Sequence, residues 1–225
     1  MNCQNVTDIP RNDIMVDLEQ QHLLYSNLPN IVIGFHGCDK KIYDKILYEH
    51  QPFKPSRNDY DWLGNGMYFW EHNLKRAWEW AECGRTNPKL HIDTPAVIGA
   101  VIDLGFCLDL VNSYHIQQLK EQYDILRREM DIIGTPIRLN MNVKGDTNLL
   151  LRYLDCAVIE SLHKEREINN QKSYDSVRGA FLEGDPIYVS SGFREQTHIQ
   201  LCVRNPNCIK GFFAPKTVDS KWVIP

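Results

Sequence analysis

The sequence has 225 residues, of which 43% are hydrophobic and 10% aromatic. A chain of this length and composition can bury one large hydrophobic core, so we expect a single globular domain. The formal net charge of −4 gives no overall attraction for polyanions. A general affinity for nucleic acid is therefore excluded, and any such contact must use a local basic surface.

Seven cysteines are scattered along the chain without a Cys-x-x-Cys pair. An odd number at irregular spacing fits reduced thiols better than a disulfide framework or a zinc site. No apolar run is long enough to span a bilayer, and the first residues lack the basic and apolar regions of a signal peptide. We expect a cytoplasmic protein that binds neither a metal nor a membrane.

Residues 1–29 are polar apart from an amphipathic patch at residues 14–24. They are interpreted as an N-terminal arm, either packed on the body as a short helix or folded against a partner. The β-branched run at residues 31–38 predicts a buried strand. This strand ends in His36 followed by Gly37, which makes the imidazole a candidate functional group.

The segment after this strand has the residues of a capped helix and then of a loop. Asp39 is a typical N-cap, and apolar residues recur at helical spacing over residues 40–50. Residues 51–62 contain two prolines together with Lys54 and Arg57. This composition is typical of loops, and loops of this kind beside a site often contact ligand.

Residues 63–71 have the sequence Leu-Gly-Asn-Gly-Met-Tyr-Phe-Trp-Glu. Gly64 and Gly66 allow the backbone to approach a ligand closely just before an aromatic strand begins. Tyr68 on that strand can offer its ring face to a flat heterocycle. No third glycine follows and no helix opens directly, so the pattern is neither a Rossmann fingerprint nor a phosphate loop.

Residues 72–83 predict a helix that ends at Gly84. Its expected buried face consists of Leu74, Ala77, Trp78 and Ala81. Residues 95–104 are almost wholly apolar and predict a strand covered on both faces, which we place in the middle of the sheet.

The central part of the chain reads as a helical lobe. Residues 112–133 and 148–167 show apolar positions at helical intervals, with a polar turn between them. We interpret residues from about 108 to 170 as a helical insertion packed on the sheet.

Strand character returns near the C-terminus. We expect strands at residues 177–182, 187–189, 197–204 and 208–213, with a loop at residues 190–196 before the third of them. An Asn-Pro-Asn turn joins the last two strands, which predicts that they form a terminal strand pair.

The order of these pieces resembles the NAD-binding half of ADP-ribosyltransferases of the diphtheria-toxin and poly-ADP-ribose polymerase type. In that family a His-Gly strand and a Gly-x-Gly-x-Tyr-Phe strand flank the nicotinamide. The resemblance covers residues 31–104 well and residues 177–214 loosely. It implies an α+β fold, an ADP-ribosyltransferase-like split β-sandwich with flanking helices, spanning residues 30–214 and followed by a C-terminal tail at residues 215–225.

The resemblance also implies roles for particular residues. His36 would bind ribose hydroxyls, the backbone of Gly37 would bind the nicotinamide amide, and Tyr68 would stack on the ring. Gln200 stands where the family has a catalytic glutamate, and it carries no charge to stabilise a cation and cannot act as a general base. Glu195 in the preceding loop would supply the missing carboxylate. Each residue also has a structural alternative. His36 would be a buried histidine satisfied by the main chain, and Tyr68 a core aromatic with its hydroxyl paired. Gln200 would be a strand-end hydrogen-bonder, and Glu195 a solvated loop residue.

Further cofactor contacts are implied by the same alignment. Gly66 would border the nucleotide, and Lys54 or Arg57 would lie near its pyrophosphate, although a solvated loop explains the two cations equally well. A second family tyrosine is replaced by Glu79, between Trp78 and Trp80. We assign Trp78 to the nicotinamide slot, with Trp80 or a purely structural role as the alternatives.

The function implied is transfer of ADP-ribose from NAD⁺ to a macromolecule, with release of nicotinamide and no metal. An NAD glycohydrolase and a non-catalytic NAD, ADP-ribose or RNA-binding module of the same fold remain open. A small protein without a targeting signal resembles the intracellular toxins of this superfamily, including those of toxin–antitoxin and phage-defence systems. We therefore expect a neutralising antitoxin protein as a further partner.

For the acceptor, nucleic acid is placed ahead of protein, with RNA first. The expected acceptor-binding residues are Tyr188, Phe193, Arg194 and Glu195. Their aromatic rings would be stacking platforms for bases, and the arginine would contact phosphate.

Overall fold

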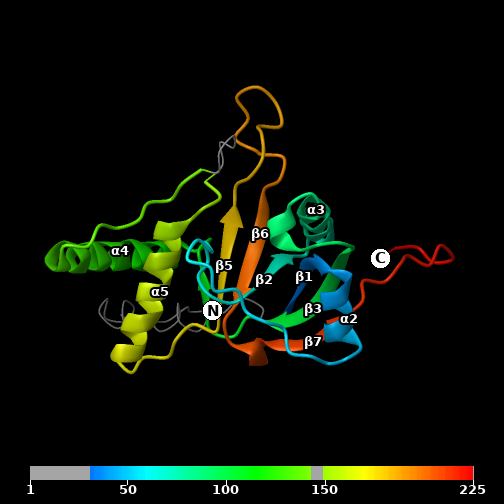
Figure 1. Ribbon diagram of the computed structural model, residues 1–225, viewed down its shortest axis with the longest axis horizontal. Helices are drawn as coiled ribbons and strands as arrows, with labels where there is room; N and C mark the ends of the chain where they lie inside the picture. The colour runs from blue at the N-terminus through cyan, green and yellow to red at the C-terminus, as the bar shows by residue number, and fades with distance from the viewer. Residues whose placement is uncertain (1–30, 143–148, 225) are drawn as a thin grey trace, which may run out of the picture.

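The computed structural model describes residues 31–142 and 149–224. Within these ranges the chain is α+β, with one seven-stranded mixed sheet and four α-helices (Figure 1). The expected N-terminal arm lies outside the described residues. No helix within them is both long and apolar enough to cross a bilayer.

The strands are β1 (Ile31–Asp39), β2 (Met67–Glu71), β3 (Pro95–Asp103), β4 (Cys107–Asp109), β5 (Ser176–Phe181), β6 (His198–Val203) and β7 (Ile209–Phe213). They lie in the order β4-β5-β6-β2-β1-β3-β7, and only β4 and β5 pair in parallel. The helices are α2 (Lys40–Leu47), α3 (Leu74–Arg85), α4 (Ser113–Ile133) and α5 (Tyr153–Ile168), with short 3₁₀ turns η1 (Pro88–Leu90) and η2 (Pro206–Cys208).

The two faces of the sheet are covered by different helices. On one face, α3 packs on Trp70 and Val97 through Ala77, and α5 packs farther along the same face. On the other face, Ile46 of α2 packs against Ala96 and Ile98. Helices α4 and α5 lie together at the β4–β5 end of the molecule, and α2 and α3 lie at the other end (Figure 1). This arrangement places the carboxyl end of β1 between α2 and α3.

Most of the predicted elements are confirmed, including the strand that carries His36, the strand that carries Tyr68, and the two helices of the lobe. The predicted N-cap is also confirmed, because the side chain of Asp39 accepts a hydrogen bond from the backbone N–H of Lys41. Strand β4 was not predicted. It has three residues, too few for a periodic pattern to be recognised in the sequence.

Three predictions about the sheet are wrong. Strand β3 is one place from the edge, because β7 pairs with it, and β2 is central. Strands β6 and β7 do not pair with each other, since three other strands lie between them. The Asn-Pro-Asn segment forms η2, capped by the Asn205 side chain, and carries the chain away from β6. Residues 187–189 form no strand and belong to the loop between β5 and β6.

The buried face of α3 also differs from the prediction. It consists of Arg76, Ala77, Ala81 and Gly84, whereas Leu74 and Trp78 are 41% and 45% exposed. Gly84 does not end the helix, which continues to Arg85. A Cβ at Gly84 would stand 2.6 Å from the Ile92 side chain, so glycine is needed there for close packing.

Asp39 joins β1, α2 and the segment before β3. One carboxylate oxygen caps α2, and the other accepts hydrogen bonds from the backbone N–H groups of Asp93 (2.8 Å) and Thr94 (2.9 Å). Burial alone would raise the pKa of this carboxyl, but the backbone donors outweigh burial and lower the pKa. The carboxylate is therefore a structural anion.

We predict that Asp39→Ala lowers the free energy of unfolding by about 2–4 kcal/mol, because it leaves three backbone donors unpaired at a buried position. The matched control is Asp44→Ala on α2, which removes an exposed ion pair with Lys40 and should change stability by less than about 0.5 kcal/mol. Urea unfolding at pH 7 measures both. Equal effects for the two variants would contradict the assignment of Asp39.

Candidate functional site

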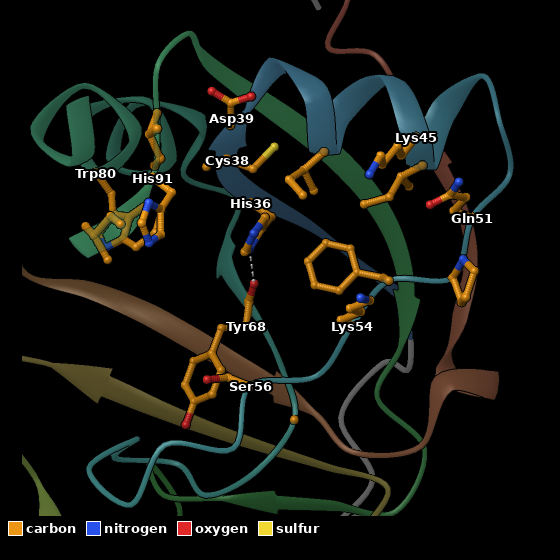
Figure 2. Close-up of a pocket in the computed structure, with 18 residues that line it drawn as sticks. His36, Cys38, Asp39, Lys45, Gln51, Lys54, Ser56, Tyr68, Trp80 and His91 are labelled. Atoms are coloured by element: carbon orange, nitrogen blue, oxygen red, sulfur yellow. Dashed lines mark hydrogen bonds between the residues drawn. The ribbon is translucent and has the colours of Figure 1, made fainter. Parts of the chain in front are cut away.

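A cavity of about 410 Å³ opens at the carboxyl end of β1. Its walls come from the end of β1, α2, the loop after α2, the start of β2, α3 and the segment after η1 (Figure 2). The lining residues are His36, Gly37, Cys38, Asp39, Ile42, Lys45, Ile46, Gln51, Pro52, Phe53, Lys54, Ser56, Gly66, Tyr68, Trp80, Leu90, His91 and Ile92. Five residues expected at the nucleotide thus border one cavity: His36, Gly37, Lys54, Gly66 and Tyr68.

His36 lies where β1 and β2 part. The two strands pair only through Gly34–Glu71 and Phe35–Trp70, and beyond that point the His36 ring bridges them. Its Nδ1 lies 2.8 Å from the backbone oxygen of Tyr68, a contact drawn as a dashed line in Figure 2.

The chemistry of this bond fixes the state of the imidazole. A carbonyl oxygen can only accept, so Nδ1 carries the proton and donates it. The ring is half-buried, and burial lowers the pKa of His36 to about 4, against a smaller raising effect of the bond to Tyr68. At neutral pH the ring is uncharged, and Nε2 presents a lone pair. This nitrogen has no hydrogen-bond partner among the described residues, so a hydroxyl donor is the group it is suited to bind.

Tyr68 is held by two hydrogen bonds at its hydroxyl. The hydroxyl donates to the backbone oxygen of Gly64 (2.7 Å) and accepts from the backbone N–H of Leu63 (3.0 Å). Burial raises the pKa of Tyr68 well above its usual value, so the phenol stays neutral and has no acid–base role at physiological pH. What the residue offers to a ligand is the ring, in a fixed orientation.

The side chains of His36 and Tyr68 leave the sheet on opposite faces. His36 lies on the same face as Gly34, and a Cβ at Gly34 would contact Phe69, so His36 and Phe69 share a face. Tyr68 precedes Phe69 along β2 and therefore points to the other face. Both residues line the cavity because it lies at the point where the strands separate. The sequence predicts that the imidazole and the phenol ring flank a ligand as a pair, whereas the structure places the two rings on opposite faces, and the group of Tyr68 that meets His36 is its backbone oxygen.

The glycines of the Gly64–Gly66 pair are required by packing within the protein. Gly64 has φ of +79°, and a Cβ there would stand 2.4 Å from Glu160. A Cβ at Gly66 would stand 2.5 Å from the sulfur of Cys202, and the Gly66 backbone is already paired with Ser56 in both directions. Gly66 therefore borders the cavity with its peptide groups already bonded. The two glycines are therefore explained by a tightly packed loop, and they do not leave unpaired peptide groups for a ligand to bind.

Gly37 is also constrained by packing. A Cβ at this position would stand 2.1 Å from the backbone oxygen of Ala77, so α3 lies directly on the strand. Gly37 pairs with Val97 of β3 in the register of the sheet. The residue borders the cavity, and its missing side chain is what allows α3 to form one of the cavity walls.

Lys54 and Arg57, both expected near a pyrophosphate, lie on different sides of an extended segment. Lys54 and Ser56 line the cavity, and Pro55 and Arg57 line a second cavity of about 360 Å³. The double backbone pairing of Ser56 with Gly66 forms the wall between the two cavities. Lys54 and Lys45 both border the first cavity and have no ion-pair partner among the described residues.

Trp78 does not line either cavity and is 45% exposed. Trp80 does line the first cavity, with its ring centroid 6.4 Å from that of His36. Two positions along a helix turn a side chain by more than half a turn, which explains why the neighbouring tryptophan is the one at the site. Glu79 pairs with Arg76 at 2.8 Å and is not part of the cavity wall.

Gln200 lies on the Tyr68 face of the sheet. It pairs with Trp70 across β2, whereas Ile199 and Leu201 point to the other face. It does not line the cavity. Its side-chain oxygen accepts a hydrogen bond from the indole N–H of Trp62, so the amide is held in place by the loop before β2.

The expected acceptor residues lie in the loop between β5 and β6, which projects beyond the ends of these strands in Figure 1. Tyr188 and Phe193 are 60% and 70% exposed. Arg194 donates to the backbone oxygen of Gly184, and Glu195 is exposed. None of the four lines the first cavity. The loop backbone is ordered by hydrogen bonds across it, such as Ile187 N–H to Phe193 O.

Sequence reasoning missed three residues of the cavity wall, Lys45, Phe53 and His91, and it also missed Trp62, which lies outside the cavity wall and bonds to Gln200. Phe53 packs edge-on against His36 with centroids 4.7 Å apart. Lys45 and His91 reach the cavity from α2 and from the segment after η1. These residues come from a helix face and from loops that only tertiary contacts bring together, so no local sequence pattern marks them. The one signal in the sequence was the position of Trp62 beside the Gly64–Gly66 pair.

The described residues contain no group of three or more His, Cys, Asp or Glu side chains arranged to hold a metal ion. The six cysteines among them are free thiols, and burial raises the pKa of the Cys38 and Cys107 thiols to about 12. These thiols are inert at neutral pH.

Comparisons with known proteins give one distant relative. An uncharacterized protein of Methanocaldococcus jannaschii is 29% identical over 211 residues, which cover 82% of this chain and 89% of the relative. No protein-family model matches the sequence. No solved structure matches it either.

Two histidines with lowered pKa values predict a loss of stability in mild acid. Burial lowers the pKa of both His36 and His163 to about 4. In the unfolded chain each titrates near 6.5, so below this pH the unfolded state binds more protons and stability falls until the folded pKa is reached. At pH 5 each should cost about 2 kcal/mol relative to pH 7.5, in a range where carboxylates remain ionised.

Urea unfolding at pH 7.5 and pH 5.0 measures this loss. His163→Leu should make the difference between the two pH values smaller by about 2 kcal/mol, whatever its effect at pH 7.5. Equal stability of the original protein at both pH values would contradict the lowered pKa values of these rings.

Proposed function

We propose that this protein cleaves NAD⁺ and transfers ADP-ribose to a macromolecule, with release of nicotinamide. One observation carries the proposal: a neutral His36, fixed through Nδ1 to the Tyr68 backbone, presents Nε2 to a cavity that Tyr68, Lys54, Gly37 and Gly66 also border. Three separate stretches of chain contribute these residues. Their order in the sequence is the order that the transferase resemblance requires.

Each residue has a role that its chemistry allows. The lone pair of His36 Nε2 accepts from a ribose hydroxyl, and the fixed ring of Tyr68 packs on the flat nicotinamide. Lys54 and Lys45 provide positive charge for the pyrophosphate. The N-glycosidic bond breaks with its electron pair leaving on nicotinamide, and the acceptor nucleophile bonds to the ribose carbon and loses a proton. Holding the dinucleotide in place supplies most of the catalysis in such a reaction.

A second candidate is a non-catalytic module that binds NAD or ADP-ribose. It is favoured by the lack of a free carboxylate among the described residues that line the cavity. Asp39 is the one carboxylate among its described lining residues, and backbone donors occupy both of its oxygens. Gln200 carries no charge. A developing ribosyl cation would therefore find no free carboxylate in the cavity wall. We propose that Glu195 supplies a carboxylate to the acceptor from the β5–β6 loop. In an NAD glycohydrolase, water would take the place of the acceptor.

For the acceptor we keep the order RNA before protein, on the exposed rings of Tyr188 and Phe193 and the nearby Arg194. A cytoplasmic toxin or phage-defence effector of this kind requires a neutralising antitoxin protein. Loss of toxicity on co-expression with a neighbouring gene product supports that partner, and constitutive expression without growth cost counts against it.

We predict that His36→Ala and Tyr68→Ala each reduce nicotinamide release at least a hundredfold, because binding orientation worth about 3 kcal/mol is lost. Tyr68→Phe keeps the ring and loses only two bonds to the loop, so it should retain most activity. Nicotinamide release is measured from purified protein, with and without cell lysate, and folding is checked by urea unfolding.

The lysate separates the three candidates. Nicotinamide release that requires lysate indicates a transferase, whereas release that is the same without lysate indicates a glycohydrolase. No release together with retained NAD⁺ binding indicates the module. Full activity in a folded His36→Ala, Tyr68→Ala double variant would refute the assignment of the site.

We predict that Glu195→Ala lowers labelling of the acceptor by labelled NAD⁺ at least tenfold more than it lowers nicotinamide release. Gln200→Ala should instead impair release itself. The matched control is Asp185→Ala, an exposed carboxylate in the same loop. Label that is destroyed by protease and resists nuclease would reverse the order of RNA and protein. Equal losses in both assays for Glu195→Ala would contradict its acceptor role.

A further inference from the structure

The second cavity, of about 360 Å³, has no part in the proposed function. Its walls come from the loop before β2, the last turn of α5, the segment before β5 and the residues that follow β6. Four charged residues border it, namely Arg57, Glu167, Asp175 and Arg204. The partners of these four side chains decide what the cavity can bind.

Two of the four charges are neutralised within the protein. Arg204 pairs with Glu160 of α5 through two nitrogens and donates to the backbone oxygen of Asn65 (3.0 Å). Asp175 pairs with Lys172 at 2.9 Å. The side chains of Arg204 and Asp175 are only 19% and 14% exposed. They form a fixed part of the wall whose charges are already balanced.

Arg57 is a cation without a partner. It is exposed, and it has no ion pair among the described residues. The acidic residues nearest to it in the chain are bonded elsewhere, because Asp59 pairs with Arg138 and Asp61 accepts hydrogen bonds from Asn58. The guanidinium is therefore available to an anionic group of a ligand, which it can bind through two N–H donors.

Glu167 is an anion in an unfavourable place. It lies in the last turn of α5, where the helix dipole favours cations and disfavours a carboxylate. Its side chain is exposed and has no ion pair among the described residues, and it does not pair with Arg57 although both border the same cavity. A cation bound beside Glu167 would balance the carboxylate and the negative end of α5 together.

These groups rule out several classes of ligand. One free cation accompanied by a free carboxylate does not suit a chain of phosphates. Tyr174, the one aromatic residue among those that line the cavity, is 3% exposed and stacks on Phe106 with ring centroids 4.4 Å apart. It offers no open ring face to a nucleobase. The remaining class is a small molecule that carries both an anionic and a cationic group.

We propose that the second cavity binds a free α-amino acid with a polar side chain. The ligand carboxylate pairs with the guanidinium of Arg57, and the ligand ammonium pairs with the carboxylate of Glu167. Asn65 and Ser173 also border the cavity, and their amide and hydroxyl groups can bind the polar side chain of the ligand. The volume lies within the range of small-molecule sites. This site goes beyond the proposed function and does not depend on NAD⁺.

Thermal unfolding of the full-length protein measures this binding. L-glutamine, L-asparagine and L-serine are the probes, and at about 10 mM at least one of them should raise Tm by about 2 °C or more. N-acetyl-L-glutamine, which has no ammonium, and L-glutamine amide, which has no α-carboxylate, should leave Tm unchanged. No shift with any of the three amino acids, or an equal shift with sodium acetate or ammonium chloride alone, would overturn the proposal.

Substitutions place the binding in the second cavity. Arg57→Gln and Glu167→Gln should each abolish the shift in Tm, and both positions are exposed, so the unliganded variants should melt close to the original protein. Lys54→Gln is the matched control, because Lys54 belongs to the same extended segment but lines the first cavity. A shift that survives Arg57→Gln or Glu167→Gln, or one that Lys54→Gln also removes, would overturn the assignment.

The outcome is independent of the enzymatic proposal. Neither measurement uses NAD⁺ or nicotinamide, so a protein that releases no nicotinamide can still bind an amino acid in the second cavity. Conversely, nicotinamide release by a protein whose Tm no amino acid changes would support the proposed function and refute the second site.

Discussion

The hydrogen bond between His36 Nδ1 and the Tyr68 carbonyl is the interaction on which the site depends. It occurs where the ladder between β1 and β2 stops, and it replaces a backbone pair with a side-chain bridge. This contact links the two strands beyond their last backbone pair, selects the tautomer, and leaves the other ring nitrogen without a partner among the described residues. Packing of α2 on one face and α3 on the other then encloses the space that the separated strands leave open.

The local parts of this arrangement could be predicted from the sequence. The β-branched run, the Asp39 cap and the helical periodicities fixed most elements, because each depends on residues close in the chain. His36 and Tyr68 could be singled out for the same reason, since His36 precedes Gly37 near the end of β1 and Tyr68 follows the Gly64–Gly66 pair near the start of β2. Their meeting at one cavity followed from the order of the motifs.

The remaining features depend on tertiary contacts that no local pattern reports. The turn sequence after β6 predicted a hairpin of β6 and β7, but β7 pairs with β3 and forms the edge of the sheet farthest from β4. Trp80 and not Trp78 reached the cavity, because Ala77 and Ala81 set the buried face of α3. Strand alternation separates Gln200 from Ile199 and Leu201, but its indole partner lies 138 residues earlier in the chain, a separation at which sequence alone gives no pairing information.

The wall between the two cavities has a consequence for how this sequence can change. Side chains of an extended segment alternate between its two sides, and here the alternation sends Lys54 to one cavity and Arg57 to the other. Inserting or deleting one residue ahead of the Ser56–Gly66 pairing would exchange the side chains that the two chambers receive. The charged side chain that faces each cavity would then change because of the shift in alternation alone, although every amino acid of the segment is retained.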